Sequence, residues 1–242
     1  MALVTLFCPE IPEPGESTVL DAGESHHAVR VRRFSAGDTV RLVDGCGVIA
    51  RGQIKPGVRG QEIVVEICER HTQRPPPRVI HVAAALPKGD RQATLFDMLT
   101  QLGVSSFTPL HCERSVVRPG KAAAMRWRRV CVEACKQSGN AYLPVLHGES
   151  TPDQAVESMR MRGAACFLAH AGASSEAARY PGADPVGLFI GPEGGFTEPE
   201  VRAALDKGAV PIALGRYTLR IETAAVAWVS AVRLNQHWKG VD

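Results

Sequence analysis

The stretch Gly191-Pro192-Glu193-Gly194-Gly195-Phe196-Thr197-Glu198-Pro199-Glu200 follows directly on an apolar run, Val-Gly-Leu-Phe-Ile, at residues 186–190. Three glycines within five residues let the backbone approach a ligand closely and adopt positive φ angles. Thr197 is a candidate N-cap for a helix that begins at Glu198, with Pro199 in its first turn. A buried strand, a glycine loop and a helix N-terminus predict a cradle for a small molecule, although a purely structural turn would have the same pattern. The loop fits neither GxGxxG nor GxxxxGK[ST], so the common dinucleotide and NTP fingerprints are absent.

A second loop of the same kind lies at residues 214–224, LGRYTLRIETA, after a predicted strand at residues 210–214. Glu222 and Thr223 suit the first turn of the helix predicted at residues 222–237, where an acid or a hydroxyl satisfies free amides. Helix capping gives no account of Arg220, whose charge lies near the positive end of that helix. Its planar fork of donors suits an oxyanion, a phosphate or a nucleobase carbonyl.

The region around these loops alternates strands with helices. Strands are predicted at residues 79–86, 106–110, 165–169, 186–190 and 210–214, and helices at 91–102, 121–138, 155–161, 198–207 and 222–237. On the helix at 91–102, the expected buried face consists of Leu95, Met98, Leu99 and Leu102. This alternation predicts an α/β domain with a mostly parallel sheet, in which ligands bind at the carboxyl ends of the strands. Both loops occupy such a position.

The first third of the chain has a different pattern. Strands at residues 39–43 and 48–54 flank an Asp-Gly turn, a further strand is predicted at 61–68, and a short helix at 26–34 would have Ser25 as its N-cap. The segment HTQRPPPR at residues 71–78 is the clearest linker, because three prolines exclude a helix or a central strand. We therefore expect a small β-barrel in residues 1–74 and the α/β domain in residues 75–242.

Composition narrows the class of protein. The 242 residues are 45% hydrophobic and 22% charged, which excludes disorder of the whole chain. No apolar run approaches the ~20 residues of a membrane helix, and the N-terminus lacks the features of a signal peptide, so a soluble cytoplasmic protein is expected. The seven cysteines are expected to be small buried hydrophobes in a reducing compartment, and the scattered histidines predict no metal site.

The net charge of +3 is unevenly distributed along the chain. Residues 1–74 carry −1, residues 75–136 carry +6 and residues 137–242 carry −2. A local basic region is the electrostatic footprint expected for binding a polyanion, although a solvated arginine-rich helix face would have the same composition.

GPEGGFTEPE followed by LGRYTLRIETAA resembles the paired signature of the RsmE family, the 16S ribosomal RNA uridine-N3 methyltransferases of the SPOUT (trefoil-knot) superfamily. ESHHAVRVRR at residues 24–33, KGDR at 88–91, CERSVV at 112–117 and EACKQSGN at 133–140 resemble other motifs of the same family. The likeness runs nearly end to end. Gln101 stands where relatives usually carry glutamate, Lys136 replaces a usual acid, and Asn140 replaces a usual arginine.

The resemblance implies a PUA-like β-barrel followed by an α/β domain whose C-terminal segment forms a deep knot. It implies S-adenosylmethionine (SAM) as cofactor, held by the loops after Ala169, Ile190 and Leu214, and a homodimer with the site at the subunit interface. It implies 16S rRNA in the small ribosomal subunit as substrate, with no membrane and no metal.

The resemblance and the residue types together give three sets of candidate residues. The catalytic candidates are Arg220, Glu193 and Glu222. The cofactor candidates are Leu168, His170, Ile190, Gly191, Pro192, Glu193, Gly194, Gly195, Leu214, Gly215, Leu219, Arg220 and Thr223. The RNA-binding candidates are Arg30, Arg32, Arg33, Lys88, Arg91, Arg114, Arg118 and Asn140, which suit phosphate contacts that position the substrate.

Other functions remain open at this point. A SPOUT methyltransferase acting on another rRNA atom, such as a ribose 2′-O, would carry the same motifs. A non-catalytic RNA-binding assembly factor would keep the PUA-like domain with an inert knot. A nucleotide-binding enzyme that uses the GPEGG loop for phosphate is disfavoured because no Walker lysine is present.

Overall fold

The computed structural model of the chain describes residues 3–26, 34–56, 62–173 and 184–234. The chain divides into two compact units, of which the first comprises Met1–Pro75 with Val132–Leu143, and the second Pro76–Cys131 with Pro144–Asp242. The division expected at residue 74 does not include Val132–Leu143 in the first unit. Apolar side chains explain this difference, since Val132, Ala141 and Leu143 share one buried cluster with Phe7, Val43 and Ile49.

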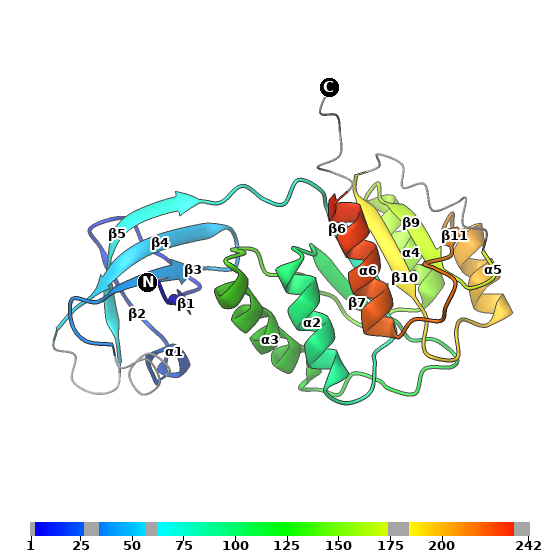
Figure 1. Ribbon diagram of the computed structural model, residues 1–242, viewed down its shortest axis with the longest axis horizontal. Coiled ribbons are helices and arrows are strands. Elements are labelled where there is room, and N and C mark those ends of the chain that lie inside the picture. The colour runs from blue at the N-terminus through cyan, green and yellow to red at the C-terminus, as the bar shows by residue number, and fades with distance from the viewer. Residues whose placement is uncertain (1–2, 27–33, 57–61, 174–183, 235–242) are drawn as a thin grey trace, which may run out of the picture. The chain divides into compact units, whose positions relative to one another are not determined.

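The first unit is built on a curled five-stranded sheet in the order β1-β3-β4-β5-β2 (Figure 1). Its strands are β1 (Thr5–Phe7), β2 (Ser17–Val19), β3 (Thr39–Val43), β4 (Val48–Ile54) and β5 (Val64–Thr72). β1 pairs with β3 in parallel, and the other pairs are antiparallel. The core of this unit includes the fully or almost fully buried Leu6, Val40, Leu42, Val65 and Ile67.

The β3–β4 hairpin is confirmed, and Asp44 organises its turn. The Asp44 carboxylate accepts the Cys46 and Val48 N–H groups at 2.7 and 2.9 Å, and Gly45 adopts a φ of +81°. Strand β5 is longer than expected and includes His71 and Thr72, so the linker begins later than residue 71.

Helix α1 (Ala22–His26) begins four residues before the helix expected at residues 26–34. Ser25 lies inside α1 instead of capping it, and its hydroxyl donates to the Leu20 carbonyl and accepts the Ile63 N–H, both at 3.1 Å. Asp21 takes the capping role because its carboxylate accepts the Glu24 N–H at 2.8 Å. The remainder of the expected helix at residues 27–33 lies outside the described residues.

A buried ion pair lies within the first unit. Glu24 accepts the Phe7 N–H at 3.1 Å through one oxygen and the Lys136 ammonium at 2.8 Å through the other. Burial lowers the pKa of Lys136, but its hydrogen bonds to Glu24 and Glu133 outweigh this effect and hold the pKa above its usual value. The lysine that departs from the family pattern is therefore a structural partner of Glu24.

The second unit contains a six-stranded parallel sheet in the order β11-β9-β10-β6-β7-β8. Its strands are β6 (Ile80–Ala84), β7 (Ser106–Pro109), β8 (Val145–Leu146), β9 (Ala165–Ala169), β10 (Val186–Ile190) and β11 (Val210–Ile212). The central strands β6 and β10 are buried at every position, as expected for parallel strands covered on both faces. All carboxyl ends lie at one edge, which is where ligands bind in such sheets.

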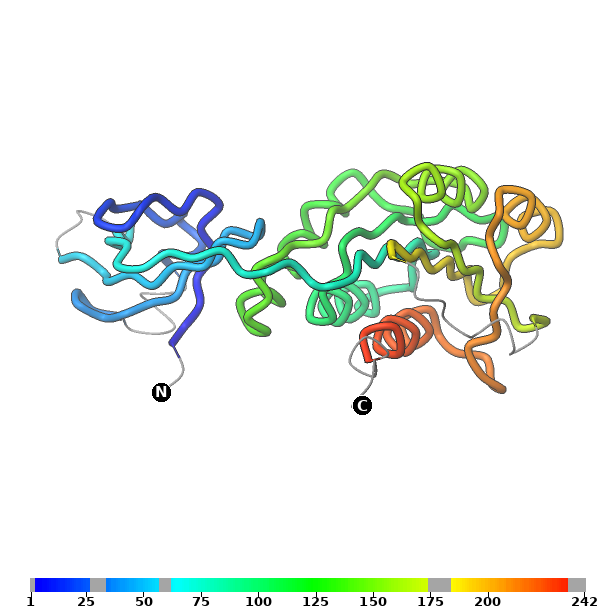
Figure 2. Tube along the Cα trace, turned by 90° about the horizontal axis from the view of Figure 1, so that it is seen from above, coloured from blue at the N-terminus to red at the C-terminus, as the bar shows by residue number. Residues whose placement is uncertain are grey.

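Helices cover both faces of this sheet. They are α2 (Arg91–Gln101), α4 (Pro152–Met161), α5 (Glu198–Asp206) and α6 (Ile221–Leu234), whereas α3 (Ala123–Ser138) begins in this unit and its residues from Val132 belong to the first one. α2 and α6 pack together on one face, and α4 and α5 pack together on the other (Figures 1 and 2). The alternation of strands and helices predicted from the sequence is therefore confirmed.

Several details differ from the expectation. Met98 is 40% exposed, whereas Phe96 and Thr100 are buried beside Leu95 and Leu99. Helix α4 begins at Pro152 instead of residue 155, because proline suits the first helical turn. Five cysteines are buried as expected, but Cys46 and Cys68 are exposed.

Among the described residues, no helix is both long enough and apolar enough to span a membrane.

Candidate active site

The glycine loop connects β10 to α5, and its far end is fixed by a reciprocal cap. Glu200 accepts the Thr197 N–H at 2.8 Å and the Thr197 hydroxyl at 3.1 Å. The N-cap predicted at Thr197 is confirmed, and Glu200 completes the capping box. The loop is thus held between a buried strand and a capped helix.

Two glycines of the loop are required by its geometry. A Cβ atom added to Gly191 would lie 3.1 Å from the backbone nitrogen of Phe196 and 3.1 Å from its ring. Gly195 has a φ of +70°, a conformation that side chains other than glycine rarely adopt. The loop therefore folds back tightly on itself and presents backbone to the neighbouring space.

A pocket of about 430 Å³ opens beside this loop, at the carboxyl edge of the sheet. We call it the glycine-loop pocket. Segments after β9, β10 and β11 line it, which are the three loops expected to hold a cofactor. The expected residues that line it are His170, Ile190, Gly191, Pro192, Glu193, Gly194, Gly195, Leu214, Gly215 and Leu219.

Three expected cofactor residues lie elsewhere. Leu168 is completely buried in the core, because it belongs to β9 and not to the loop that follows this strand. Thr223 and Arg220 are exposed at the start of α6 and do not line the pocket. These residues are adjacent to the pocket-lining loops in the sequence, but their side chains do not line the pocket.

The lining of the pocket combines features that a nucleoside with a charged tail requires. Ile190, Leu214 and Leu219 supply apolar surface for a flat ring. The glycines expose peptide N–H and C=O groups for polar contacts, and Glu193 and Glu198 add negative charge that suits a cationic group. The residues present are consistent with a cofactor of the SAM type.

The segment after β7 is tied to the glycine loop. Arg114 donates from Nη1 to the Gly194 carbonyl at 2.7 Å, and the Glu113 N–H donates to Glu200 at 2.8 Å. Arg114, a candidate for RNA binding, lines the glycine-loop pocket. Burial, followed by the charge of Glu200, raises the pKa of the Cys112 thiol to about 12, so this cysteine does not serve as a nucleophile.

Arg91 joins the two candidate acids. Its guanidinium lies 3.3 Å from a Glu193 oxygen and 3.8 Å from a Glu222 oxygen. Glu222 is 8% exposed, and its second oxygen has no hydrogen-bond partner among the described residues. Both acids therefore pair with Arg91, and neither forms an ion pair with Arg220 within the described structure.

Arg220 occupies the N-terminal end of α6. Its carbonyl accepts the Ala224 N–H at 2.8 Å, which makes it part of the first helical turn. Its side chain is exposed, so its guanidinium is accessible to a substrate at the edge of the sheet.

The other RNA-binding candidates have varied environments. Lys88 is exposed after β6, and Arg118 is 59% exposed with contacts to His111 and Glu149. Asn140 does not extend its amide toward solvent, because that amide bonds the Tyr142 carbonyl and N–H at 3.1 and 3.0 Å. Arg30, Arg32 and Arg33 lie outside the described residues.

Sequence reasoning missed several residues of the pocket. They are Ala169, Ala171, Phe196, Glu198, Arg216, Tyr217, Thr218, Ile221 and Ala224, with Arg114 from a different loop. Most belong to the two quoted motifs and could have been included by taking each loop whole. Within the described part of the chain, no group of three or more histidine, cysteine or acidic side chains is placed to hold a metal ion.

Comparisons with known proteins agree with this geometry. Residues 74–233 match the RNA methyltransferase domain, and residues 20–68 match the RNA methyltransferase PUA domain. Ribosomal RNA small subunit methyltransferase E of Mycobacterium tuberculosis is 30% identical over 98% of this chain and 94% of that protein. The protein of the same name from Bacillus subtilis is 28% identical over 86% of each chain.

Solved structures are similar over nearly the whole length. Ribosomal RNA small subunit methyltransferase E of Neisseria gonorrhoeae, bound to S-adenosyl methionine, has a TM-score of 0.86 and 25% identity, with 97% of this chain and 98% of that chain covered. A Legionella pneumophila protein with the bound cofactor SAM has the same TM-score and coverage, with 28% identity.

The unit that contains the parallel sheet is an RNA methyltransferase domain, and the glycine-loop pocket lies at the carboxyl edge of that sheet. Within that class, the chain belongs to the ribosomal RNA small subunit methyltransferase E family.

Proposed function

We propose that this chain transfers a methyl group from SAM to N3 of a uridine in 16S rRNA of the small ribosomal subunit, in the cytoplasm and as a homodimer. The observation that carries the proposal is the glycine-loop pocket, built from three loops at the carboxyl edge of a parallel sheet. The names of the family members supply the substrate class, and the family likeness implies the deep C-terminal knot.

The cofactor would be held mainly by backbone groups. Gly191, Gly194 and Gly195 would offer peptide groups to its polar atoms, while Ile190, Leu214 and Leu219 would enclose its ring. Further contacts would come from His170, Pro192 and Gly215. When bound, SAM supplies an activated methyl on a sulfonium centre, so the protein contributes position and electrostatics.

The substrate base must be unpaired or flipped, because N3 of uridine is engaged in pairing within a duplex. Arg220 would donate to a uracil carbonyl or a nearby phosphate, which stabilises the anion that forms as N3 loses its proton. Its exposed side chain on the fixed first turn of α6 supports this role.

The two acids would have different roles. Glu193 has a side chain that is 44% exposed and would accept the N3 proton, directly or through water. Glu222 is buried and would position Arg91, which in turn holds Glu193 at 3.3 Å. Lys88 and Arg118, with Arg30, Arg32 and Arg33, would contact RNA phosphates.

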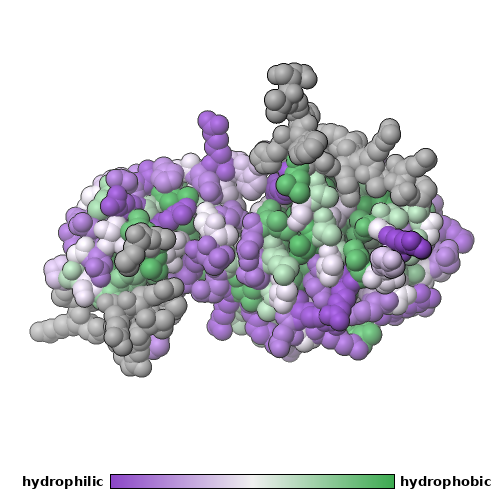
Figure 3. Space-filling model, in the orientation of Figure 1, coloured by the Kyte–Doolittle hydropathy of each residue, from purple (hydrophilic) through white to green (hydrophobic). Residues whose placement is uncertain are grey.

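Exposed residues on the outer face of α6, the side turned away from the sheet, support the proposal that two chains associate. Thr223, Ala227 and Leu234 are exposed along one side of this helix, and Met98 is exposed on the neighbouring α2. Figure 3 shows hydrophobic colours gathered over α6 and α2. A helix that is apolar on two sides is normally covered on both. The sheet covers the inner side of α6, and a second copy of the chain would cover its outer side.

The decisive experiment is transfer of a labelled methyl from SAM to assembled small subunits and, separately, to naked rRNA, followed by nucleoside mass spectrometry. N3-methyluridine is the expected product. A ribose 2′-O-methyl product would instead establish another target atom. An absence of transfer with both substrates, together with no SAM binding by calorimetry, would indicate a non-catalytic assembly factor.

A further inference from the structure

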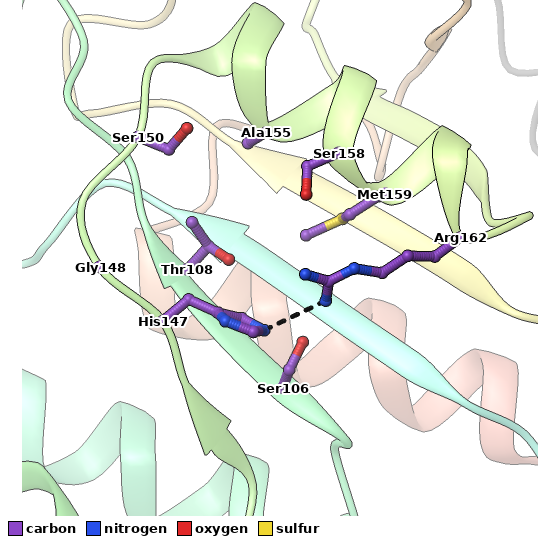
Figure 4. Close-up of a pocket in the computed structure, with 9 residues that line it drawn as sticks. All are labelled: Ser106, Thr108, His147, Gly148, Ser150, Ala155, Ser158, Met159 and Arg162. Carbon is purple, nitrogen blue, oxygen red and sulfur yellow. Dashed lines mark hydrogen bonds between the residues drawn. The ribbon is translucent and has the colours of Figure 1, made fainter.

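A second pocket lies between α4 and the sheet, and it shares no lining residue with the glycine-loop pocket (Figure 4). Its volume is about 170 Å³. We call it the α4 pocket. Its polar lining comes from β7, from the segment after β8 and from α4, and consists of Ser106, Thr108, His147, Ser150, Ser158 and Arg162.

The floor and the rim of the α4 pocket differ in depth. Ser106 and Thr108 are 3% and 7% exposed on β7, at the floor. Arg162 is exposed at the end of α4, and in Figure 4 its guanidinium reaches across the opening toward His147, with Ser158 beside it. A ligand would therefore meet hydroxyl groups below and a guanidinium above.

The lining carries positive charge and, among the residues that form it in the described structure, no carboxylate. The acids nearby in sequence are engaged elsewhere. Glu149 lies 3.9 Å from His111, and Glu157 pairs with Lys207 at 2.7 Å. Arg162 thus faces the pocket without a neutralising partner among the lining side chains.

Two histidines beside the pocket respond to this charge. The Arg162 guanidinium, which can only donate, lies 3.5 Å from His147 Nε2. Burial, and then the charge of Arg162, lowers the pKa of His147. Behind the floor, His81 Nδ1 lies 2.6 Å from the Ser106 hydroxyl, and burial followed by Arg162 and His147 lowers its pKa as well.

We infer that the α4 pocket is a phosphate-binding site, with Arg162 as the charged donor and the hydroxyls of Thr108, Ser106 and Ser158 as neutral ones. A guanidinium fork matches the oxygens of a phosphate, and charge-assisted hydrogen bonds are the stronger kind. A volume of 170 Å³ accommodates one phosphate group with bridging waters, since each water occupies about 30 Å³. The phosphate has two possible sources, a free phosphate compound or the backbone of the RNA.

The test is a titration of the whole protein with inorganic phosphate, followed by calorimetry and by phosphorus NMR. Wild type is expected to bind saturably, and Arg162→Gln to weaken the binding about tenfold or more, because the charged donor is lost. Arg160→Gln is the matched control, since Arg160 is exposed on the same helix and does not line the pocket. SAM affinity should be the same in all three proteins, which separates this site from the proposed function.

Two further measurements keep the inference testable if a variant fails to fold. Thr108→Val keeps the shape of the side chain and removes a floor hydroxyl, so a smaller loss of phosphate affinity is expected. In the wild type, bound phosphate should raise the pKa of His147, and the NMR signals of the His147 ring measure this pKa. The pKa rises because the anion would offset the positive charge of Arg162 and of protonated His81, which are the charged and titratable groups that face His147.

Competition identifies the source of the phosphate. A short single-stranded RNA that displaces inorganic phosphate assigns the site to the RNA backbone, and phosphate binding that RNA leaves unchanged assigns it to a free phosphate compound. The inference is overturned if wild type shows no saturable binding, or if Arg162→Gln and Arg160→Gln bind phosphate equally well.

Discussion

Single atoms decide the shape of the glycine-loop pocket, and Gly191 is the most restrictive position. Its added Cβ would lie 3.1 Å from the Phe196 backbone nitrogen, whereas at Gly194 it would meet only the movable Arg114 side chain at 3.3 Å. We expect Gly191→Ala to weaken SAM binding by about tenfold, equivalent to about 1.4 kcal/mol. The reason is that the loop must open to make room for the methyl side chain of the alanine. Calorimetry measures this. Gly120→Ala is the control, since no atom lies within 4 Å of its added carbon, and wild-type SAM affinity in Gly191→Ala would contradict the cradle.

Lys136 supports a second prediction at the residue scale. Its side chain is 7% exposed and that of its partner Glu24 is 10% exposed. Lys136→Met should lower the free energy of unfolding by about 3 kcal/mol, because a buried carboxylate loses its counter-charge. Urea denaturation measures the loss, and Glu24→Gln combined with Lys136→Met should recover most of it. Equal stability of the single and double variants would show that the uncompensated carboxylate of Glu24 is not the cause of the loss.

Local residue roles could be predicted from the sequence, and distant ones could not. Thr197 was predictable as a cap because its partner Glu200 is three residues away. The glycine-loop partners of Arg91 and Arg114 could not be predicted, because they are 102 and 80 positions away in the chain. The charge pattern of a sequence does not show whether an arginine is free to bind RNA or forms an ion pair or hydrogen bond within the chain.

At the scale of elements, periodicity located the long helices and the buried strands but missed the shortest ones. β1 has three residues and β8 has two, which are too few to show alternation. Two helices begin earlier than expected, because a capping residue or a proline determines where they start. These residues are Asp21 before α1 and Pro152 in α4. The five strands of the α/β region that were predicted all lie in the parallel sheet.

The pairing of β6 with β7 gives a pH-dependent prediction. His81 on β6 is 8% exposed and bonded to Ser106 on β7, and burial, followed by Arg162 and His147, lowers its pKa below the usual 6.5. The unfolded chain therefore binds more protons than the folded one, so stability is complete above about pH 6.5 and declines as the pH falls below it. Urea midpoints at pH 7.5 and 5.5 should show a larger loss for wild type than for His81→Asn. Equal losses in both proteins would show that His81 does not contribute.

At the scale of the whole molecule, the positive charge of residues 75–136 is partly neutralised within the chain itself. Arg91 pairs with Glu193 and Glu222, Arg118 lies 4.0 Å from Glu149, and Lys136 is buried against Glu24. The +6 charge of this segment therefore overstates what is available to RNA. This reconciles a modest net charge of +3 with a substrate that is a polyanion, because binding would depend on a few exposed cations and on the first unit.

The outer face of α6 supplies the last prediction, which concerns the assembly. Ala227 is exposed on this face, one turn after Thr223 and two turns before Leu234. Arginine is a good helix former, so Ala227→Arg should leave the fold of each chain intact and introduce a bulky charge where a second copy would pack. Wild type should have twice the 26.0 kDa mass of one chain in light scattering, and the variant should have the mass of one chain. Gln154→Arg adds the same charge to an exposed position of α4, on the opposite face of the sheet, and should remain a dimer.

Since the site is expected at the subunit interface, Ala227→Arg should also lose methyl transfer while its circular dichroism is unchanged. A monomeric wild type, or a dimeric and active Ala227→Arg, would show that this face of α6 is not where two chains meet.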